Sequence, residues 1–513
     1  MLRLTFLHPH SSKWSEMDLL WIFIVLLSIT WLISMISKTR TIAKLPPGPK
    51  PLPLIGNLLA LGDQPHKSLA NLAKSYGPIM TLKLGQVTTV VISSSAMAKQ
   101  VLQTHDQFLS SRTVPDSMTT HNHDLFGLPW MPVSPLWRNL RRVCNTQLLA
   151  PRILDANENL RRGQVEELVT EISRCALKGD EAVDFGKVAF VTTVNLLWNT
   201  IFSEDFVDPN SKIGREFKVA VRGIMEEAVK PNFGDYFPLL KRFDVQGIKK
   251  RQSVYFDRIF DVLEQIIDER IDEQKKSFGS NKIKHDFLHY LLNLGDENSD
   301  IKLGRDEFKH LLAVLFIAGT DTSSATFQWA MAELLKNPQK LSKAQQEIRS
   351  VIGKGNPIKE SDISRLPYLQ AVIKETLRLH SPPFLLPRKA LEDVEISGFT
   401  IPKDAQVLVN LWAMGRDSNA WKNPEVFEPE RFLEMEIDIK GRNFELVPFG
   451  AGRRICPGLS LAMRMLPLML GSVLHFFDWK LEDGCGPDDL NMDEKYGITL
   501  EMASPLRAFP LLV

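Results

Sequence analysis

A single cysteine in a segment rich in glycine and arginine constrains this chain more than any other feature. Residues 449–458 read Phe-Gly-Ala-Gly-Arg-Arg-Ile-Cys-Pro-Gly. Glycine lets the backbone approach a flat ligand closely and adopt positive φ. Arg454, two residues before Cys456, supplies positive charge that helps to keep a thiolate ionised. The segment therefore predicts a loop wrapped around one sulfur that ligates a metal, and the alternative is a buried cysteine in a surface loop.

Composition excludes several classes of function. The 513 residues include 62 Lys and Arg against 61 Asp and Glu, so the charge balance does not favour nucleic acid as a partner. The four cysteines (Cys144, Cys175, Cys456 and Cys485) have no C-x-x-C spacing, which argues against a zinc site. So few scattered cysteines fit a reducing compartment. We expect one large catalytic domain, because the motifs below must converge on one site.

The N-terminal region predicts a membrane anchor. Residues 19–37 carry no charge and would nearly span a bilayer core as a helix. Lys38, Arg40 and Lys44 follow, and the positive-inside rule places the rest of the chain in the cytosol. The prolines of residues 45–49 predict a stiff spacer. The expected division is a leader (1–18), a transmembrane anchor (19–37), a basic and proline-rich hinge (38–49) and a catalytic domain (50–513); a buried soluble helix is the alternative for 19–37.

Beyond the hinge the chain predicts an α-rich α+β fold. Residues 79–85 and 88–93 alternate like strands, and residues 394–401 with 407–410 predict a second sheet. Apolar spacing predicts mostly helix over 137–380. This region includes a long helix over 306–337, which Pro338 closes. Much helix with small separate sheets is typical of the α+β class.

The long helix contains the sequence Ala318-Gly319-Thr320-Asp321-Thr322. Glycine inside a helix costs about 1 kcal/mol relative to alanine, so this cluster needs a reason. Ala318 and Gly319 leave room for a flat group against the helix. Thr322 can turn its hydroxyl to its own backbone or to a ligand, which favours a local bulge. The alternative is close helix packing with a threonine bonded back to its own helix.

The pattern F-x-x-G-x-R-x-C-x-G resembles the haem-binding loop of the cytochrome P-450 monooxygenases, and 318–322 is similar to the oxygen-activating motif of that family. The resemblance covers essentially the whole chain. It implies the cytochrome P-450 fold and haem b, with Cys456 as the axial iron ligand. Asp321 and Thr322 would relay protons as an acid–hydroxyl pair. The residues implied to contact haem through the loop and the long helix are Phe449, Gly452, Gly458, Ala318 and Gly319.

The same resemblance implies roles for charged residues elsewhere in the chain. Glu375 and Arg378 stand three apart on one helical face, and with Arg431 they would form a buried structural triad. Haem carries two propionates that need cationic partners. By resemblance these partners are Trp137, Arg141, Arg388 and Arg454, although any one arginine could instead be a solvated surface charge.

Within the family the chain resembles plant microsomal members of the geraniol-hydroxylase-like type, through the proline hinge, residues 232–238 and the cysteine loop. This implies a single-pass protein of the endoplasmic reticulum membrane that oxidises a small lipophilic substrate, a mono- or sesquiterpenoid, with O₂. No nucleotide-binding glycine motif occurs, so electrons would come from a separate reductase, and the resemblance implies that this is the NADPH-dependent reductase of the same membrane.

The expected substrate pocket is apolar, and the resemblance implies that it is lined from residues 114–128, 233–243, 313–318 and 383–386 together with 496–498. Residues 237–240 are expected to contact the bilayer. The alternatives are a phenolic or xenobiotic substrate oxidised by the same chemistry, a haem-thiolate isomerase or dehydratase, and a membrane haem protein for electron transfer or sensing.

Overall fold

The computed structural model describes residues 21, 44–204, 212–276, 286–294, 303–482 and 484–513. The leader, the predicted anchor apart from Trp21, and residues 38–43 of the hinge lie outside this set. In the described part, Pro46 is buried, and the amide of Thr81 donates to the Pro47 carbonyl at 2.8 Å. The proline-rich end of the predicted hinge therefore packs on the folded body.

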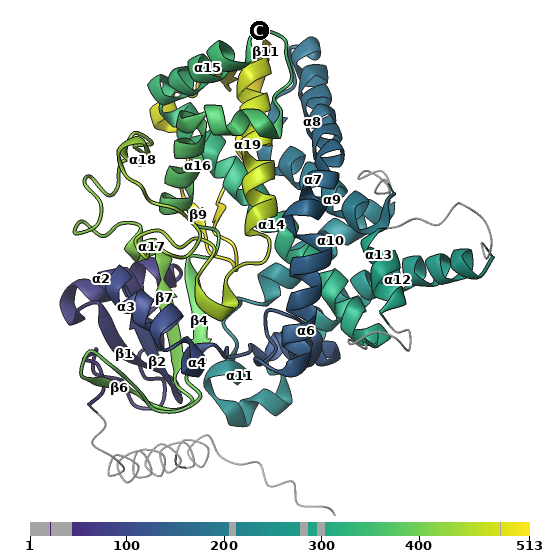
Figure 1. Ribbon diagram of the computed structural model, residues 1–513. Coiled ribbons are helices and arrows are strands. Elements are labelled where there is room, and N and C mark those ends of the chain that lie inside the picture. The colour runs from purple at the N-terminus through teal and green to yellow at the C-terminus, as the bar shows by residue number, and fades with distance from the viewer. Residues whose placement is uncertain (1–20, 22–43, 205–211, 277–285, 295–302, 483) are drawn as a thin grey trace, which may run out of the picture.

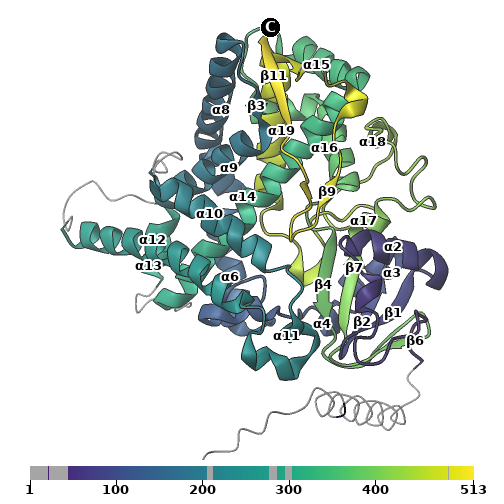
Figure 2. The same ribbon diagram turned by 180° about the vertical axis from the view of Figure 1, so that it is seen from behind.

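The described chain is mostly helical with small sheets, as predicted (Figures 1 and 2). The long helices surround α14, which runs through the middle of the molecule behind α19 in Figure 1. The helices are α2 (Pro65–Tyr76), α3 (Ser95–Lys99), α4 (Asp106–Leu109), α5 (His123–Phe126), α6 (Pro135–Val143), α7 (Pro151–Ala156), α8 (Glu158–Lys178), α9 (Phe185–Phe202), α10 (Lys212–Glu227), α11 (Phe233–Tyr236), α12 (Ile248–Lys276), α13 (Phe287–Asn293), α14 (Arg305–Lys336), α15 (Pro338–Ile352), α16 (Pro367–Leu379), α17 (Leu411–Met414), α18 (Arg431–Glu434) and α19 (Leu459–Phe476).

The largest sheet joins strands from residues 79–92 with strands from residues 385–410. Its order is β1-β2-β7-β4, and β2 pairs in parallel with β7, with Val90 opposite Val407. The prediction that 407–410 belongs with 394–401 was wrong, because β5 and β6 pair only with each other. The strands are β1 (Ile79–Leu84), β2 (Val87–Ile92), β3 (Val183–Asp184), β4 (Leu385–Lys389), β5 (Val394–Ile396), β6 (Phe399–Ile401), β7 (Gln406–Asn410), β8 (Phe477–Leu481), β9 (Glu494–Lys495), β10 (Glu501–Met502) and β11 (Arg507–Leu512).

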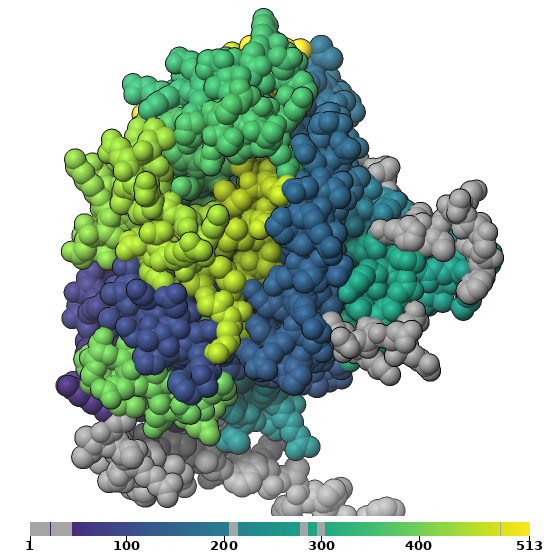
Figure 3. All heavy atoms as spheres, viewed as in Figure 1, coloured from purple at the N-terminus to yellow at the C-terminus, as the bar shows by residue number. Residues whose placement is uncertain are grey.

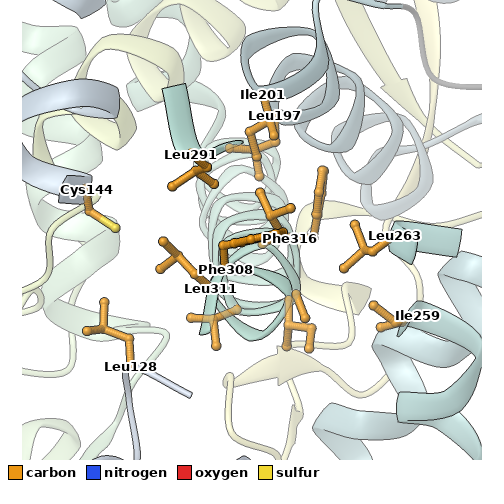
Figure 4. Close-up of a cluster of buried hydrophobic side chains, with 14 of the residues drawn as sticks. Leu128, Cys144, Leu197, Ile201, Ile259, Leu263, Leu291, Phe308, Leu311 and Phe316 are labelled. Carbon is orange, nitrogen blue, oxygen red and sulfur yellow. The ribbon is translucent and has the colours of Figure 1, made fainter. Parts of the chain in front are cut away.

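The central helix α14 carries the main hydrophobic core. Asp306 and Glu307 lie in its first turn, where they complement the helix dipole, and Pro338 opens the next helix. Phe308, Leu311 and Phe316 of α14 meet side chains of α9 and α12 in one cluster (Figure 4). The helix stays α-helical from Arg305 to Lys336. The bulge expected around Thr322 is therefore absent from this helix, although the threonine hydroxyl does bond back to the backbone.

One helix among the described residues, α19, is long and apolar enough to cross a membrane. Most of it is buried inside the protein, as expected of a core helix. Its N-terminal end lies in the middle of the molecule, between the labels of β4 and α6 in Figure 1. This end of α19 positions the cysteine.

Candidate active site

The cysteine loop is closed on itself and pinned to the chain around α4. The Cys456 amide donates to the Phe449 carbonyl at 2.9 Å. Gly452 has φ +68°, and a Cβ there would lie 2.1 Å from the Leu102 carbonyl oxygen, so only glycine fits. The Arg453 amide donates to the Asp106 carboxylate at 3.0 Å. The glycine signal in the sequence thus reflects both the turn and a close backbone contact.

The Cys456 thiol sits beside the N-terminus of α19. The backbone N–H groups of Gly458 and Leu459 point to its sulfur, and Arg141 and Arg112 act on it from across the site. These donors and cations favour the thiolate. The protein packed around the sulfur still raises the pKa of Cys456 above its ordinary value. The residue is exposed on one side, so a ligand can reach the sulfur.

Arginines with unsatisfied donors face the same space. Burial, with repulsion from Arg112 and Arg454, lowers the pKa of Arg388 to about 9. Burial and repulsion from Arg141 lower the pKa of Arg112 to about 10. The Nε atoms of Arg112 and Arg388 are buried, and neither has a hydrogen-bond partner among the described residues. Buried polar groups are normally paired, so this cluster calls for an anionic ligand.

The guanidinium groups of Arg454 and Arg141 donate hydrogen bonds to backbone carbonyls. Arg454 donates to the carbonyls of Ser110 at 2.8 Å, of Leu128 and Pro129 at 3.3 Å, and of Met131. Arg141 donates to the Ile455 carbonyl. Arg454 therefore ties the cysteine loop to two distant segments, and it has less donor capacity left for a ligand than Arg112 or Arg388.

Trp137 supports these cations with its ring. Its indole N–H donates to the Leu128 carbonyl at 3.1 Å, and the Arg454 and Arg141 guanidinium groups lie 4.8 and 5.5 Å from the ring centroid. Both separations are within the range of a cation–π interaction. In this structure the indole N–H is committed to the backbone, so the ring face is the part of Trp137 that meets the charged cluster.

The two small residues of α14, Ala318 and Gly319, have different surroundings. Ala318 is exposed, whereas a Cβ on Gly319 would lie 2.8 Å from Leu197 of α9. Gly319 therefore permits close packing of α9, and its contact with a flat ligand stays a prediction. The Thr322 hydroxyl donates to the Ala318 carbonyl at 2.9 Å. This bond is the helix back-bond that the sequence left open as an alternative.

The carboxyl of Asp321 lies near a second carboxyl. Burial raises the pKa of Asp321 to about 7, and the negative charge of Glu501 on β10 adds to the effect. Thr499 is the other polar side chain beside it. Asp321 can consequently hold a proton near neutral pH, which suits a group that moves protons.

The structure brings Glu375, Arg378 and Arg431 together. Arg378 donates to both oxygens of Glu375, at 2.7 and 2.8 Å, and Arg431 donates to Oε1 at 3.1 Å. All three side chains are buried. Remaining donors reach backbone carbonyls between residues 415 and 426, including those of Pro424 and Val426. The triad therefore fastens α16 to the segment that precedes the cysteine loop.

Sequence reasoning missed Arg112 and Glu501. Arg112 follows no local motif, and it reaches the site only because Ser111 forms a β-bridge with Lys389, next to Arg388 on β4. Glu501 lies in a two-residue strand far from Asp321 in sequence. A pair of this kind becomes visible only when the fold places β10 against α14.

Comparisons with known proteins agree with this geometry. The cytochrome P-450 family model matches residues 46–503. The chain belongs to the cytochrome P-450 family. It is 52% identical over 496 residues to geraniol 8-hydroxylase from Catharanthus roseus, covering 96% of this chain and 99% of that protein. It is 47% identical over 490 residues to drimenol monooxygenase from Persicaria hydropiper, covering 95% and 96%.

A further relative is geranylhydroquinone 3''-hydroxylase from Arnebia euchroma, 48% identical over 478 residues, with 93% of this chain and 95% of that protein covered. This cytochrome P-450 is therefore a monooxygenase, and its family implies a haem-iron cofactor. The residues present fit that group, because an accessible thiol at a helix N-terminus lies near Arg112 and Arg388, whose buried Nε atoms have no hydrogen-bond partner among the described residues. A flat group that contains iron and carries two carboxylates could bind the thiol through its iron and the arginines through its carboxylates.

Proposed function

We propose that this protein is a membrane-anchored haem-thiolate monooxygenase that hydroxylates a small terpenoid. The observation that carries the proposal is that one site contains both the Cys456 thiol and the buried Nε atoms of Arg112 and Arg388, which have no hydrogen-bond partner among the described residues. Cys456 would ligate the iron of haem b, and Arg112, Arg388 and Arg141 would meet its propionates. Trp137 and Arg454 would hold this cluster in place.

The remaining residues have roles that follow from their positions. Haem, when bound, supplies the oxygen-activating chemistry, which an axial thiolate promotes. Ala318 would border the reacting space on α14. Asp321 holds a proton on its carboxyl oxygen and would pass it toward the Thr322 hydroxyl, whose own hydrogen is donated to Ala318. The apolar side chains around the site would exclude bulk water.

The nature of these apolar side chains supports a terpenoid substrate. Ala313 and Ile317 belong to one buried hydrophobic cluster, and Val114 and Ile498 pack against it. These residues come from three of the regions expected to line the pocket. The names of three relatives refer to oxidation of geraniol, drimenol or a geranylhydroquinone. A flexible hydrocarbon with one hydroxyl suits such a lining. Since one relative acts on a prenylated phenol, a phenolic substrate is the second candidate.

The proposed setting is the endoplasmic reticulum membrane, with the catalytic domain in the cytosol and an NADPH-dependent reductase as electron donor. Exposed apolar side chains support the contact with lipid. Leu239 is 81% and Phe243 70% exposed, in the segment after α11. The Gln86 amide, at the β1–β2 turn, donates to the Tyr236 carbonyl at 2.9 Å, which brings this segment beside the N-terminal sheet. The teal region around α11 forms part of the lower edge of Figure 3. Exposed apolar groups here would rest on lipid.

The test is a substrate panel. Microsomes that contain the full chain and a plant reductase would receive NADPH with geraniol, nerol, a drimane alcohol, a prenylated hydroquinone or a simple phenol. We expect a product 16 mass units heavier from a terpenoid alcohol, dependent on reductase and with one atom from ¹⁸O₂. Oxidation of the simple phenol alone would overturn the terpenoid assignment. Product without reductase or O₂ would favour an isomerase or dehydratase.

A further inference from the structure

The short hairpin β9–β10 carries a charged network that connects the surface of α10 with Asp321. Glu501 lies directly opposite Lys495 in this antiparallel pair, so the two side chains share one face. Lys495 Nζ lies 2.9 Å from Glu226 Oε1 on α10, and Arg222 Nε lies 3.1 Å from the same oxygen. Glu501 therefore lies on the side of the hairpin that faces α10.

The opposite face of the hairpin fixes it in the core. Leu500 is fully buried and Met502 nearly so. The Leu500 carbonyl accepts from the Trp329 indole of α14 at 2.8 Å, and its amide donates to the Pro382 carbonyl at 3.0 Å. Strand β10 is thus held against α14 by packing and by the hydrogen bond from the Trp329 indole. These constraints hold Glu501 close to Asp321 without help from the charges.

Exposure falls along the network toward the active site. Arg222 is 61% exposed, Glu226 42% and Lys495 39%, and Glu501 and Asp321 are partly buried. The charged groups that act on Asp321 are Glu501 from β10 and Arg222 from α10, and Thr499 is the neutral neighbour. Two carboxyls side by side, the outer one next to a solvated network, make a route by which a proton can reach the inner one.

We propose that Glu501 is the positioning residue for proton supply: it takes protons from solvent at the Lys495–Glu226 end and hands them to Asp321. In each transfer the O–H bond on Glu501 breaks as the proton bonds to a carboxylate oxygen of Asp321, and Glu501 regains a proton from water. No electron moves. This inference rests on the proposed monooxygenase function and adds the step that replenishes Asp321.

The charge of Glu501 has a second consequence. It disfavours the ionised form of Asp321, so Asp321 stays protonated to a higher pH than it would alone. Removing that charge should lower the pH at which Asp321 ionises. Product formation per NADPH, which needs the protonated form, should then fail at a lower pH than in the wild type.

The test compares Glu501→Gln with Glu395→Gln, a matched exchange of an exposed glutamate in the other short hairpin, β5–β6. Full-length enzyme with reductase is measured for product per NADPH and for hydrogen peroxide between pH 6 and 9. We expect Glu501→Gln to keep the carbon monoxide spectrum but to move the alkaline limit of coupling down by about one pH unit. Glu395→Gln should match the wild type.

A second readout does not depend on turnover. The infrared band of the protonated Asp321 carboxyl, obtained as wild type minus Asp321→Asn, should titrate at lower pH in Glu501→Gln. Glu501→Ala, made in parallel, removes the same charge should the amide fold poorly. An unchanged pH profile and unchanged titration would overturn the proposal while leaving the monooxygenase intact. Loss of haem in both Glu501 variants would make the residue structural, and that outcome too overturns it.

A failure of the underlying function would look different. If the wild type itself gave no thiolate-type carbon monoxide spectrum or no oxygenated product, the monooxygenase assignment would fall. If Asp321→Asn coupled as well as the wild type at every pH, Asp321 would have no part in proton delivery, and Glu501 would have nothing to supply.

Discussion

Arg378 grips Glu375 with two hydrogen bonds, at 2.7 and 2.8 Å, in a part of the core where both side chains are almost completely buried. A carboxylate held by a guanidinium fork in this way is fixed in direction as well as compensated in charge. Arg431 adds the second cation and Glu428 contributes an amide donor to the same carboxylate at 2.7 Å. The pair therefore fixes α16 to the segment that leads to Cys456.

Breaking the Arg378–Glu375 pair should prevent accumulation of folded protein. Arg378→Lys cannot replace the fork, and it would leave carbonyls and Glu375 without donors. We expect a loss of about 3–5 kcal/mol in the free energy of unfolding, measured by denaturant titration and by haem-loaded yield. Arg365→Lys, in an exposed pair with Asp362 at 2.5 Å, is the control and should cost under about 1 kcal/mol. Equal costs in the two variants would contradict a buried role.

Cys456→Ser should abolish the carbon monoxide spectrum of a thiolate-ligated haem, because a serine hydroxyl does not ionise at this site. The spectrum of the reduced protein is the measurement. Ser replacements of Cys144, Cys175 and Cys485 should retain it, since Cys144 and Cys175 are buried and Cys485 lies by the C-terminal strands. A thiolate spectrum that survives in Cys456→Ser would mean that another residue ligates the iron.

Arg112→Ala should weaken haem binding without weakening the fold. The guanidinium repels Arg141 and Arg388, and its Nε has no hydrogen-bond partner in the described part of the chain. It donates to the Pro129 carbonyl at 3.1 Å, but Arg454 also donates to that oxygen, so removal of Arg112 should leave the melting temperature of the haem-free protein unchanged or raise it. Haem affinity should fall by about tenfold or more, as expected for a lost charge-assisted bond. Transfer of haem to apomyoglobin measures this. Arg138→Ala, exposed on α6, should transfer haem at the wild-type rate.

The N-terminal segment can be removed only up to a definite point. Deleting residues 1–43 should leave a folded, haem-loaded domain. Deleting residues 1–49 should destabilise it, because Pro46 is buried, Pro47 accepts from Thr81, and Lys44 accepts from Thr400 at 2.9 Å. Thermal unfolding of both proteins decides the matter. Identical melting temperatures would show that the contacts of residues 44–49 contribute nothing.

Thr322→Ala should uncouple the reaction. Haem content and substrate binding should stay nearly unchanged, since the hydroxyl bonds only to its own helix among the described residues. More NADPH should end as hydrogen peroxide, and product should fall by as much as about 10²-fold, because removal of a positioned proton-transfer group is costly. Thr326→Ala removes an equivalent back-bond one turn later, to Thr322 at 2.9 Å, and should remain coupled. Equal coupling in all three proteins would reduce Thr322 to a packing residue.

Sequence patterns reached the parts of this molecule whose constraints are local. The loop around Cys456 needs its glycines for positive φ and a close contact, and the span of α14 follows from apolar spacing between acidic and proline ends. Patterns failed where long-range pairing decides. The Val-Leu-Val sequence of β7 predicts a strand but not its partner, and the structure pairs it with β2, more than 300 residues earlier. The contact of Gly319 with Leu197 of α9 is likewise invisible in the sequence, because the two residues lie on different helices.

Arg454 reaches back 344 residues to the Ser110 carbonyl. At a synthesis rate of about 5–20 residues per second, the segment around Ser110 waits roughly 20–70 s on the ribosome before its partner is made. During that interval Arg112 already exists, while the loop that carries Cys456 does not. The nascent chain therefore cannot hold haem in its final coordination until almost all of it has been translated. Chaperone protection of the unfinished site, and the supply of haem at the end of translation, should govern how much active enzyme a cell obtains.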